Sequence, residues 1–361
     1  MNPQPEHARR PSRPRTGRVA KTGAVAALGV AGVLVLAGCA GGPAAGDDGS
    51  LQIVATTTQV GDFTSELVGD QAGITQLIQP GQSAHSFDPS AAQLAALASA
   101  DALVVNGAGL ETWIDDATSA SGFDGVLIDA STGIELAETG ESDHDHDHAE
   151  EVGHEGESDD AHAEDDHDHA EGNPHIWTSI ENAETMVGNI AGGLGDLDGI
   201  DAAALETARA DYLGLLDDLD SWADAAIDPV PVAERLLVTN HDAFTYFVDE
   251  FDITFVGSVI PSFDDNAEPS AAQIDALVAA IEQTGVQAVF SETSISPATA
   301  ETIATEAGVA VYSGPDALYG DSLGEPGSDG ATYLASQIHN ITQIVGSWGA
   351  SVPALPDSLA G

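Results

Sequence analysis

Basic residues and cysteine are scarce in this 361-residue chain. Eight Lys and Arg stand against sixty Asp and Glu, which gives a formal net charge of −52. A surface of this sign repels phosphate, so nucleic acid is excluded as a partner. Cys39 is the single cysteine, which excludes an internal disulfide. The chain is still long and apolar enough, at 42% hydrophobic residues, to predict roughly two or three packed units.

The few basic residues are concentrated near the N-terminus. Six of the eight precede an apolar run at Ala24–Leu36, and only Arg209 and Arg235 follow it. A basic leader, a short apolar run and then small residues are typical of a secretory signal peptide, here residues 1–38. The run is short for a membrane-spanning helix, although a short transmembrane anchor is the alternative.

The end of the apolar run predicts a lipid anchor. Leu36-Ala37-Gly38-Cys39 matches the bacterial lipoprotein processing box, and it contains the single cysteine. Cys39 would become a lipidated N-terminus followed by a flexible tether, residues 39–50. We therefore expect localisation at the cell membrane, lipid-anchored on its extracytoplasmic face.

From Leu51 onward, strand-like and helix-like segments alternate, which predicts parallel α/β sheets. The expected fold class is α/β, with two parallel-sheet α/β lobes joined by a long rigid helix. The expected divisions are an N-terminal lobe at 51–195, a linking helix at 196–228, a C-terminal lobe at 229–350 and a tail at 351–361. Expected strands lie at 51–55, 74–78, 102–105, 126–128, 235–239, 253–256, 286–290 and 309–312, and expected helices at 91–100, 179–194, 201–226, 270–284, 297–307 and 330–348.

The segment 142–172 interrupts this pattern inside the first lobe. It consists almost entirely of Asp, Glu, His, Ala and Gly, and nothing in it can be buried, so we expect a disordered loop. Its histidines are candidate accessory metal ligands, and the alternative is a solvated acidic linker. They are His144, His146, His148, His154, His162, His167 and His169.

Three histidines outside this loop lie at the ends of expected elements. His85 and His241 follow strands, and His175 begins a helical stretch. In open α/β sheets, ligands bind beyond the carboxyl ends of strands, so a metal site in the cleft between the lobes is expected. Asp316 or Asp321 would add a carboxylate, since imidazole and carboxylate form a common zinc set.

Several stretches resemble one family, the zinc and manganese ABC-transporter solute-binding proteins, cluster A-I or ZnuA-like. The similar stretches are residues 55–58, 80–89, 106–113, 173–177, 240–247 and 320–323. The resemblance implies His85, His175, His241 and Asp321 as metal ligands, and it favours Asp321 over Asp316 because Ser322 and Leu323 follow it. Ala84, where many relatives have proline, and Ser179-Ile180 depart from the family pattern without removing a ligand.

The resemblance implies a binding protein and not an enzyme. The expected function is to capture Zn²⁺ and deliver it to an ABC-type importer, with a permease and its ATPase as partners and the chain itself a monomer. Three imidazoles and one carboxylate favour zinc, whereas Mn²⁺ prefers more oxygen donors. A manganese or iron importer protein is the main alternative.

Two other classes of function are less well supported by the sequence. A zinc hydrolase needs an open coordination position and a base, for which Glu292 is the best candidate, although a supporting or capping role suits that residue better. A surface adhesin is the second. His339, in a terminal amphipathic helix, is expected to have a packing or surface role.

Overall fold

The computed structural model describes residues 51–137, 172–262 and 264–360. The predicted signal peptide, Cys39, the tether and the seven loop histidines lie outside these residues and stay predictions. The described residues all belong to one compact unit. Within the described residues, none of the helices combines the length and the apolarity that crossing a bilayer requires.

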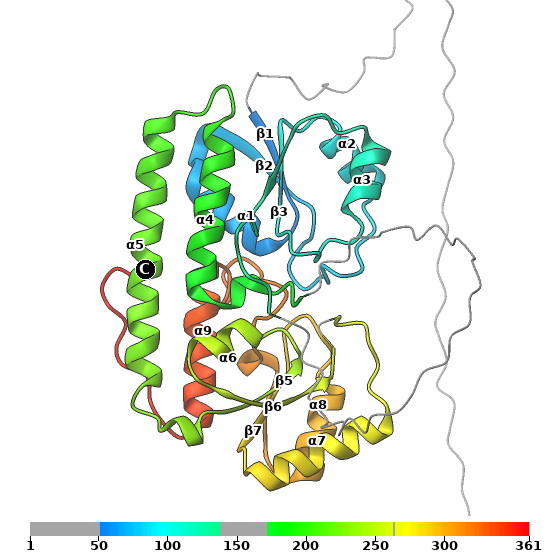
Figure 1. Cartoon of the computed structure of the whole chain (residues 1–361), viewed down its shortest axis with the longest axis vertical. Helices are drawn as coiled ribbons and strands as arrows, with labels where there is room; N and C mark the ends of the chain where they lie inside the picture. The colour runs from blue at the N-terminus through cyan, green and yellow to red at the C-terminus, as the bar shows by residue number, and fades with distance from the viewer. Residues whose placement is uncertain (1–50, 138–171, 263, 361) are drawn as a thin grey trace, which may run out of the picture. The chain divides into compact units, whose positions relative to one another are not determined.

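The first half of this unit is built on a four-stranded parallel sheet (Figure 1). Ile53 in the central β1 pairs with Ile74 on one side and with Ala102 on the other. All four strands therefore point their carboxyl ends to one edge. In the order β2-β1-β3-β4 they are β2 (Ala72–Gln76), β1 (Leu51–Ala55), β3 (Ala102–Val105) and β4 (Val126–Asp129).

Three helices and a 3₁₀ turn belong to the connections in this half. Helix α2 (Ala91–Leu97) begins in a capping box between Ser90 and Gln93. The others are α1 (Thr58–Val68), η1 (Gly69–Gln71) and α3 (Ile114–Ser121). Neither α1 nor α3 was expected from the sequence. Helix α1 is rich in β-branched residues and contains Gly61, and α3 has only eight residues, so the local helical signal is weak in both.

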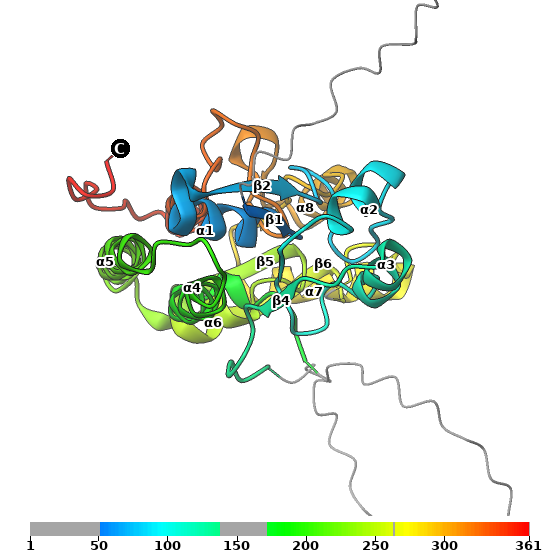
Figure 2. The ribbon, with the colours of Figure 1, turned by 90° about the horizontal axis from the view of Figure 1, so that it is seen from above.

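Two long helices, α4 (Ile180–Gly195) and α5 (Ala202–Ile227), run side by side (Figures 1 and 2). Helix α9 (Tyr333–Ser347) packs against α5 (Figure 1). Each begins at a side-chain cap, from Ser179, Asp201 and Thr332 respectively. One buried apolar cluster continues from the first sheet through these helices to Leu237 and Phe290.

The second half contains two parallel strand pairs, β5-β6 and β7-β8. Strand β6 continues beyond its expected end, past a register irregularity in its pairing with β5. The elements are η2 (Ile176–Thr178), η3 (Val232–Glu234), β5 (Leu236–His241), α6 (Thr245–Glu250), β6 (Thr254–Ile260), α7 (Ala271–Thr284), β7 (Ala288–Phe290), α8 (Ala298–Ala307), β8 (Ala310–Tyr312) and η4 (Gly314–Asp316).

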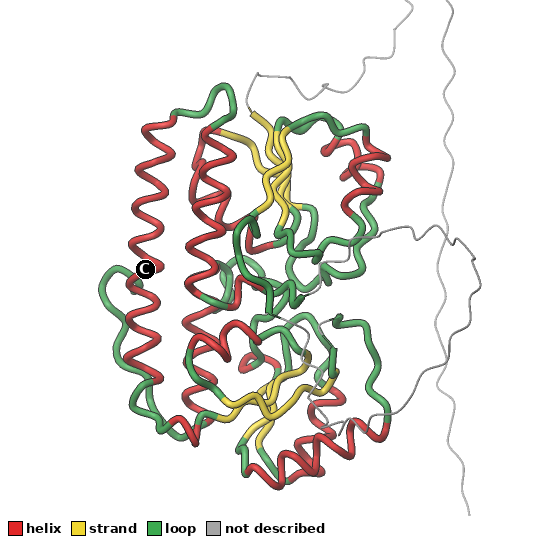
Figure 3. Tube along the Cα trace, viewed as in Figure 1, coloured by secondary structure: helices red, strands yellow, loops and turns green. Residues whose placement is uncertain are grey.

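The predicted α/β class with parallel sheets is confirmed. The strands of the two halves are separated by loops (Figure 3), and the carboxyl ends of β2 and β5 both lead into these loops. The proposed division into lobes and linking helix stays a prediction, since the described residues form one compact unit.

Candidate metal centre

Four side chains converge in the loops between the two halves. One ligand atom from each of His85, His175, His241 and Asp321 lies within 4.8 Å of all the others. The Nε2 atom of His175 lies 3.2 Å from Nε2 of His85, 3.3 Å from Nε2 of His241 and 3.0 Å from Oδ1 of Asp321. The structure therefore brings together all four residues that the family resemblance implied as ligands.

The four residues come from separate parts of the chain. His85 lies in the loop between β2 and α2, and His175 immediately precedes η2. His241 is the last residue of β5, and Asp321 lies between η4 and α9. His85 and His241 follow β2 and β5, one strand in each half, as the strand-end argument predicted, and His175 and Asp321 join them from other segments.

The orientation of the His175 ring is fixed by Asn173. The Asn173 side-chain amide donates to the carbonyl of Asp242 and to Oγ1 of Thr245, both at 2.9 Å. Its Oδ1 therefore faces Nδ1 of His175, at 2.6 Å. That oxygen can only accept, so Nδ1 carries the proton and Nε2 presents its lone pair to the centre of the cluster.

Glu292 fixes the His241 ring in the same way. Its Oε1 lies 2.8 Å from Nδ1 of His241 and accepts the backbone N–H of the same residue at 3.1 Å. Glu292 is buried, and its carboxylate supports a histidine. This contact agrees with the supporting role that the sequence favoured for Glu292 over that of a catalytic base in a hydrolase.

The backbone around Asp321 is held by residues from earlier segments of the chain. The carbonyl of Gly320 accepts from Nε2 of Gln59 at 3.2 Å and from Nε1 of Trp177 at 3.1 Å. On the other side, the N–H of Leu323 donates to Oγ1 of Thr58 at 2.9 Å. The Asp321 backbone is therefore anchored on both flanks.

The centre is almost closed to solvent. The side chains of His175, His241 and Asp321 are 0% exposed and that of His85 is 9% exposed. Both carboxylate oxygens of Asp321 are buried, and no hydrogen-bond donor from outside the four-residue cluster reaches them. A buried group of lone pairs and carboxylate oxygens is unfavourable unless a cation joins them, so the residues fit a metal ion. His85 marks the edge nearest to water.

Burial and charge act in opposite directions on these groups. Burial lowers the pKa of His175 to about 4, although Asp321 opposes the shift. Burial also acts to lower the pKa of His241, but the carboxylates of Asp321 and Glu292 outweigh it and raise that pKa well above its usual value. Burial acts to raise the pKa of Asp321, yet His241 and His175 hold it well below its usual range. The ionised form of Asp321 is therefore stabilised by its interactions with His175 and His241.

Two candidate residues lie away from the cluster. Asp316 is exposed, at the end of η4. His339 is buried on α9, with Nε2 at 3.0 Å from the carbonyl of Ala317 and its ring against Tyr319, which agrees with the expected packing role. The sequence reading missed the orienting role of Asn173, although its place two residues before His175 was a usable signal.

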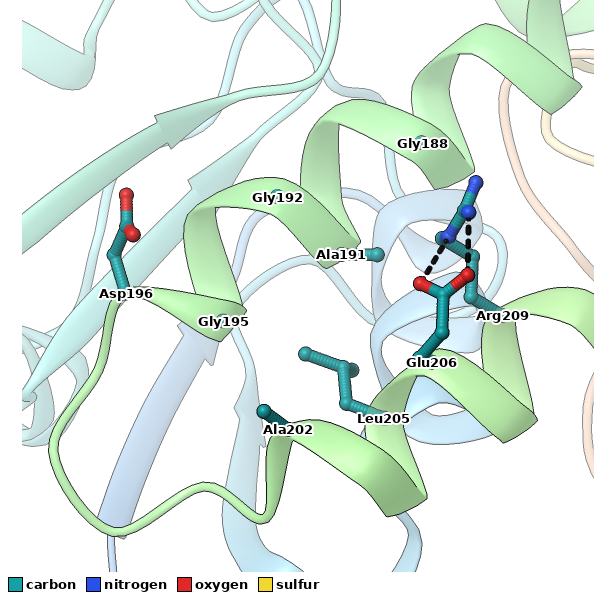
Figure 4. Close-up of a pocket in the computed structure, with 9 residues that line it drawn as sticks. All are labelled: Gly188, Ala191, Gly192, Gly195, Asp196, Ala202, Leu205, Glu206 and Arg209. Carbon is teal, nitrogen blue, oxygen red and sulfur yellow. Dashed lines mark hydrogen bonds and ion pairs between the residues drawn. The ribbon is translucent and has the colours of Figure 1, made fainter.

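A separate pocket lies between α4 and α5 (Figure 4). Its volume is about 420 Å³, and small residues of α4 line one wall. Arg209 on the opposite wall is already paired with Glu206, at 2.7 Å. No histidine or cysteine lines this pocket, and its carboxylates are those of Asp196 and Glu206.

Comparisons with known proteins identify relatives of this chain. The family model for zinc-uptake complex component A, periplasmic (ZnuA), matches residues 53–347. The manganese-binding lipoprotein MntA of Halalkalibacterium halodurans is 26% identical over 316 residues, covering 86% of this chain and 94% of its own. The zinc-binding protein AdcA of Streptococcus pyogenes is 30% identical over 264 residues, covering 73% of this chain and 49% of its own.

The fold is also shared with solved structures. The periplasmic zinc-binding protein TroA from Treponema pallidum superposes with a TM-score of 0.69 at 22% identity, covering 83% of this chain and 99% of its own. The family model covers most of the described residues of both halves. The chain therefore belongs to the ZnuA family, whose members are metal-binding, substrate-binding proteins of ABC transporters and not enzymes.

Proposed function

We propose that this protein captures Zn²⁺ through His85, His175, His241 and Asp321 and delivers it to an ABC-type importer. The observation that carries the proposal is the convergence of these four ligand atoms in a buried site. In this reading the ion is the transported substrate. The protein's task is to hold it selectively and release it to a membrane partner.

The spacing of the donor atoms suits a tetrahedral ion. With metal–ligand bonds of about 2.0–2.1 Å, the ligand atoms of a tetrahedral zinc site are about 3.3 Å apart. Here His241 Nε2 lies 3.2 Å from Asp321 Oδ1, and His85 Nε2 lies 3.7 Å from Asp321 Oδ2. Small side-chain adjustments would complete the tetrahedron.

The donor chemistry favours zinc over manganese. Three imidazole nitrogens and a carboxylate are a borderline-soft set, whereas Mn²⁺ is better matched by more oxygen ligands. Manganese is the alternative substrate, because MntA is named as manganese-binding and its match with this chain extends over 94% of the MntA sequence.

The family also supports a proposal for the location and the partners. MntA is named as a lipoprotein, and Cys39 lies in a lipoprotein processing box. We therefore place the mature chain on the extracytoplasmic face of the membrane, anchored by acyl chains on Cys39. Its partners in this proposal are an ABC permease and its ATPase, with the chain acting as a monomer.

A competition titration tests the choice of metal. The soluble chain from Ala40 is titrated with zinc and with manganese, beside His241→Ala and the control His339→Ala, which removes a buried histidine outside the cluster. We expect one tight zinc site. His339→Ala should keep this site. His241→Ala should lower the zinc affinity by more than about 100-fold, because the loss of a residue that only supports a ligand typically costs about 10–100-fold.

The outcomes are distinct. A tight site that prefers manganese would replace zinc with the alternative substrate and keep the four ligands. Equal losses in His241→Ala and His339→Ala would mean that the cluster is not the binding site. Absence of a tight site for both ions would overturn the proposed function.

A further inference from the structure

The turn between β3 and α3, residues 106–113, has an unusual backbone. Gly107, Ala108 and Gly109 have consecutive positive φ values of 80°, 54° and 75°. This conformation is unfavourable for Ala108, which has a Cβ. Such a turn persists only where its surroundings hold it in place, so its contacts show what it is built to do.

Glu111 is the main support of this turn. Its Oε1 accepts the N–H of Asn106 at 2.7 Å and the hydroxyl of Thr56 at 2.5 Å, and its Oε2 accepts the N–H of Gly107 at 3.1 Å. The residue is 5% exposed. Both carboxylate oxygens are thus used on the turn and on the end of β1. Burial raises the pKa of Glu111, and these hydrogen bonds oppose the shift.

One end of the turn contacts the segment before His175. The Asn106 side-chain amide donates to the carbonyl of Pro174 at 3.1 Å and to the carbonyl of Gly107 at 3.0 Å. Pro174 is the residue between Asn173, which orients the His175 ring, and His175 itself. Asn106 therefore fixes the backbone from which the His175 side chain projects.

The other end contacts the segment around His85. Nε1 of Trp113 donates to the carbonyl of Ala84 at 3.0 Å, immediately before His85. The Trp113 ring also packs against Phe87, with ring centroids 4.9 Å apart. His85 has no orienting side-chain partner on Nδ1 among the hydrogen bonds of the described residues, so this backbone contact is a main constraint on its position.

We propose that the turn at residues 106–113 is a clamp that sets the separation of His85 and His175, and that Glu111 is its central positioning residue. The role of this clamp rests on the proposed metal-binding function, but the contacts that form it do not depend on a bound ion. Glu111 touches no ligand atom. It acts by holding Asn106 and, through the turn, Trp113, each of which holds the residue before one histidine.

Three substitutions test separately the two contacts of the clamp, Asn106 with Pro174 and Trp113 with Ala84, and their shared support, Glu111. We call these two contacts the arms of the clamp. Asn106→Ala removes the contact to Pro174, and Trp113→Phe removes the donor to Ala84 while keeping the packing on Phe87. Glu111→Gln keeps the shape but turns an NH₂ group toward backbone N–H donors. The control is Asp101→Asn. Asp101 accepts the N–H of Gln52 at 2.8 Å at the opposite, amino end of β3.

The first measurement is a crystal structure of each metal-free variant. We expect Trp113→Phe to displace His85 alone, Asn106→Ala to displace His175 alone, and Glu111→Gln to displace both. Asp101→Asn should displace neither. Unmoved histidines in Asn106→Ala and Trp113→Phe would overturn the clamp even if Glu111→Gln does not fold.

The second measurement is zinc affinity, with the melting temperature of the metal-free protein measured in parallel. We expect about a fivefold loss of affinity for each single arm, as for one hydrogen bond, and more than tenfold for Glu111→Gln. Unchanged affinity in all three, beside a wild-type chain that binds zinc tightly, would overturn the inference alone. A wild-type chain without a tight site would overturn the proposed function, and the histidine positions would still decide the clamp.

Discussion

At the scale of single residues, the metal centre depends on close packing around the residues that support its ligands. Gly320 lies directly before the ligand Asp321, and a Cβ added to it would lie 2.0 Å from Oε2 of Glu292. Glu292 in turn orients His241. Glycine is therefore required at position 320 by the close approach of a buried carboxylate, and the requirement reaches two metal ligands.

Gly320→Ala should lower zinc affinity by about 10–100-fold, the effect expected when a residue that supports a ligand is displaced. The added methyl group forces the Glu292 carboxylate away from Nδ1 of His241. Isothermal titration with zinc measures the change. Gly346→Ala is the control, since a Cβ there meets nothing within 4 Å in α9. Equal affinity in the two variants would show that Glu292 does not position His241.

At the scale of elements, α4 shows how closely one helix is matched to its neighbours. It contains four glycines among sixteen residues, and glycine weakens a helix interior. Gly193 faces Ile128 of β4, where an added Cβ would lie 2.7 Å from the nearest side-chain atom. Gly188 and Gly192 instead face the pocket beside α5 (Figure 4), where an added Cβ meets nothing.

Two of these glycines should respond in opposite directions. Gly188→Ala should raise the free energy of unfolding by about 0.5–1 kcal/mol, because alanine loses less backbone entropy in a helix. Gly193→Ala should lower it by about 1–3 kcal/mol through overpacking against Ile128. Urea denaturation of both variants measures the difference. Stabilisation by Gly193→Ala would mean that α4 and β4 are not packed as closely as described.

The expected and observed elements agree best where an element is long and caps are clear. The capping residues Ser179, Asp201 and Ser270 each begin a helix at or next to the expected position. The apolar run at 74–78 was expected as a strand, whereas β2 is Ala72–Gln76. Leu77 and Ile78 still donate to the carbonyls of Ala55 and Thr56. Hydrophobicity thus located the buried segment but not the bounds of the strand.

At the scale of the whole molecule, acidic residues far outnumber basic ones, and buried carboxyl groups therefore matter for stability. The formal charge is −52, and Arg209 and Arg235 are the only Lys or Arg among the described residues. Arg235 is buried and donates to the carbonyls of Val230 and Phe251. Glu250, on α6, accepts the N–H of Ile180 at the start of α4, at 2.9 Å. Burial raises the pKa of Glu250 to about 7.

This pKa predicts a pH-dependent stability. The folded-state pKa of Glu250 lies above its usual value of 4.5, so its contribution is fully present below about pH 4.5 and is lost as the pH rises through about 7. The free energy of unfolding should fall from pH 5 to pH 8, and Glu250 should account for roughly 2 kcal/mol of the fall, allowing for solvent screening.

Urea denaturation across pH 5–8 tests this, comparing the wild-type chain with Glu250→Gln. The variant should lose less stability over that range because it no longer titrates. Glu206→Gln is the control, since Arg209 lowers the pKa of that exposed carboxyl and it stays ionised throughout. A variant curve parallel to the wild type would mean that Glu250 ionises normally in the folded protein.

The sequence by itself determined the α/β class, the two strand-rich halves and the three histidines at strand and helix ends. These follow from local signals, because apolar periodicity marks buried strands and helices and polar residues after strands mark a functional edge. The choice of Asp321 over Asp316 came from the family resemblance, since both follow β8 at distances that a loop can span.

Only the tertiary structure decided how the site is held. Asn173 and Glu292 orient imidazoles, and Glu111 supports a turn that reaches both His85 and His175. The hydrogen bonds between His241 and Glu292 join residues 51 positions apart, and the one between Asn106 and Pro174 joins residues 68 apart. No local pattern encodes such pairs, because chain packing brings them together and burial makes each unpaired partner costly.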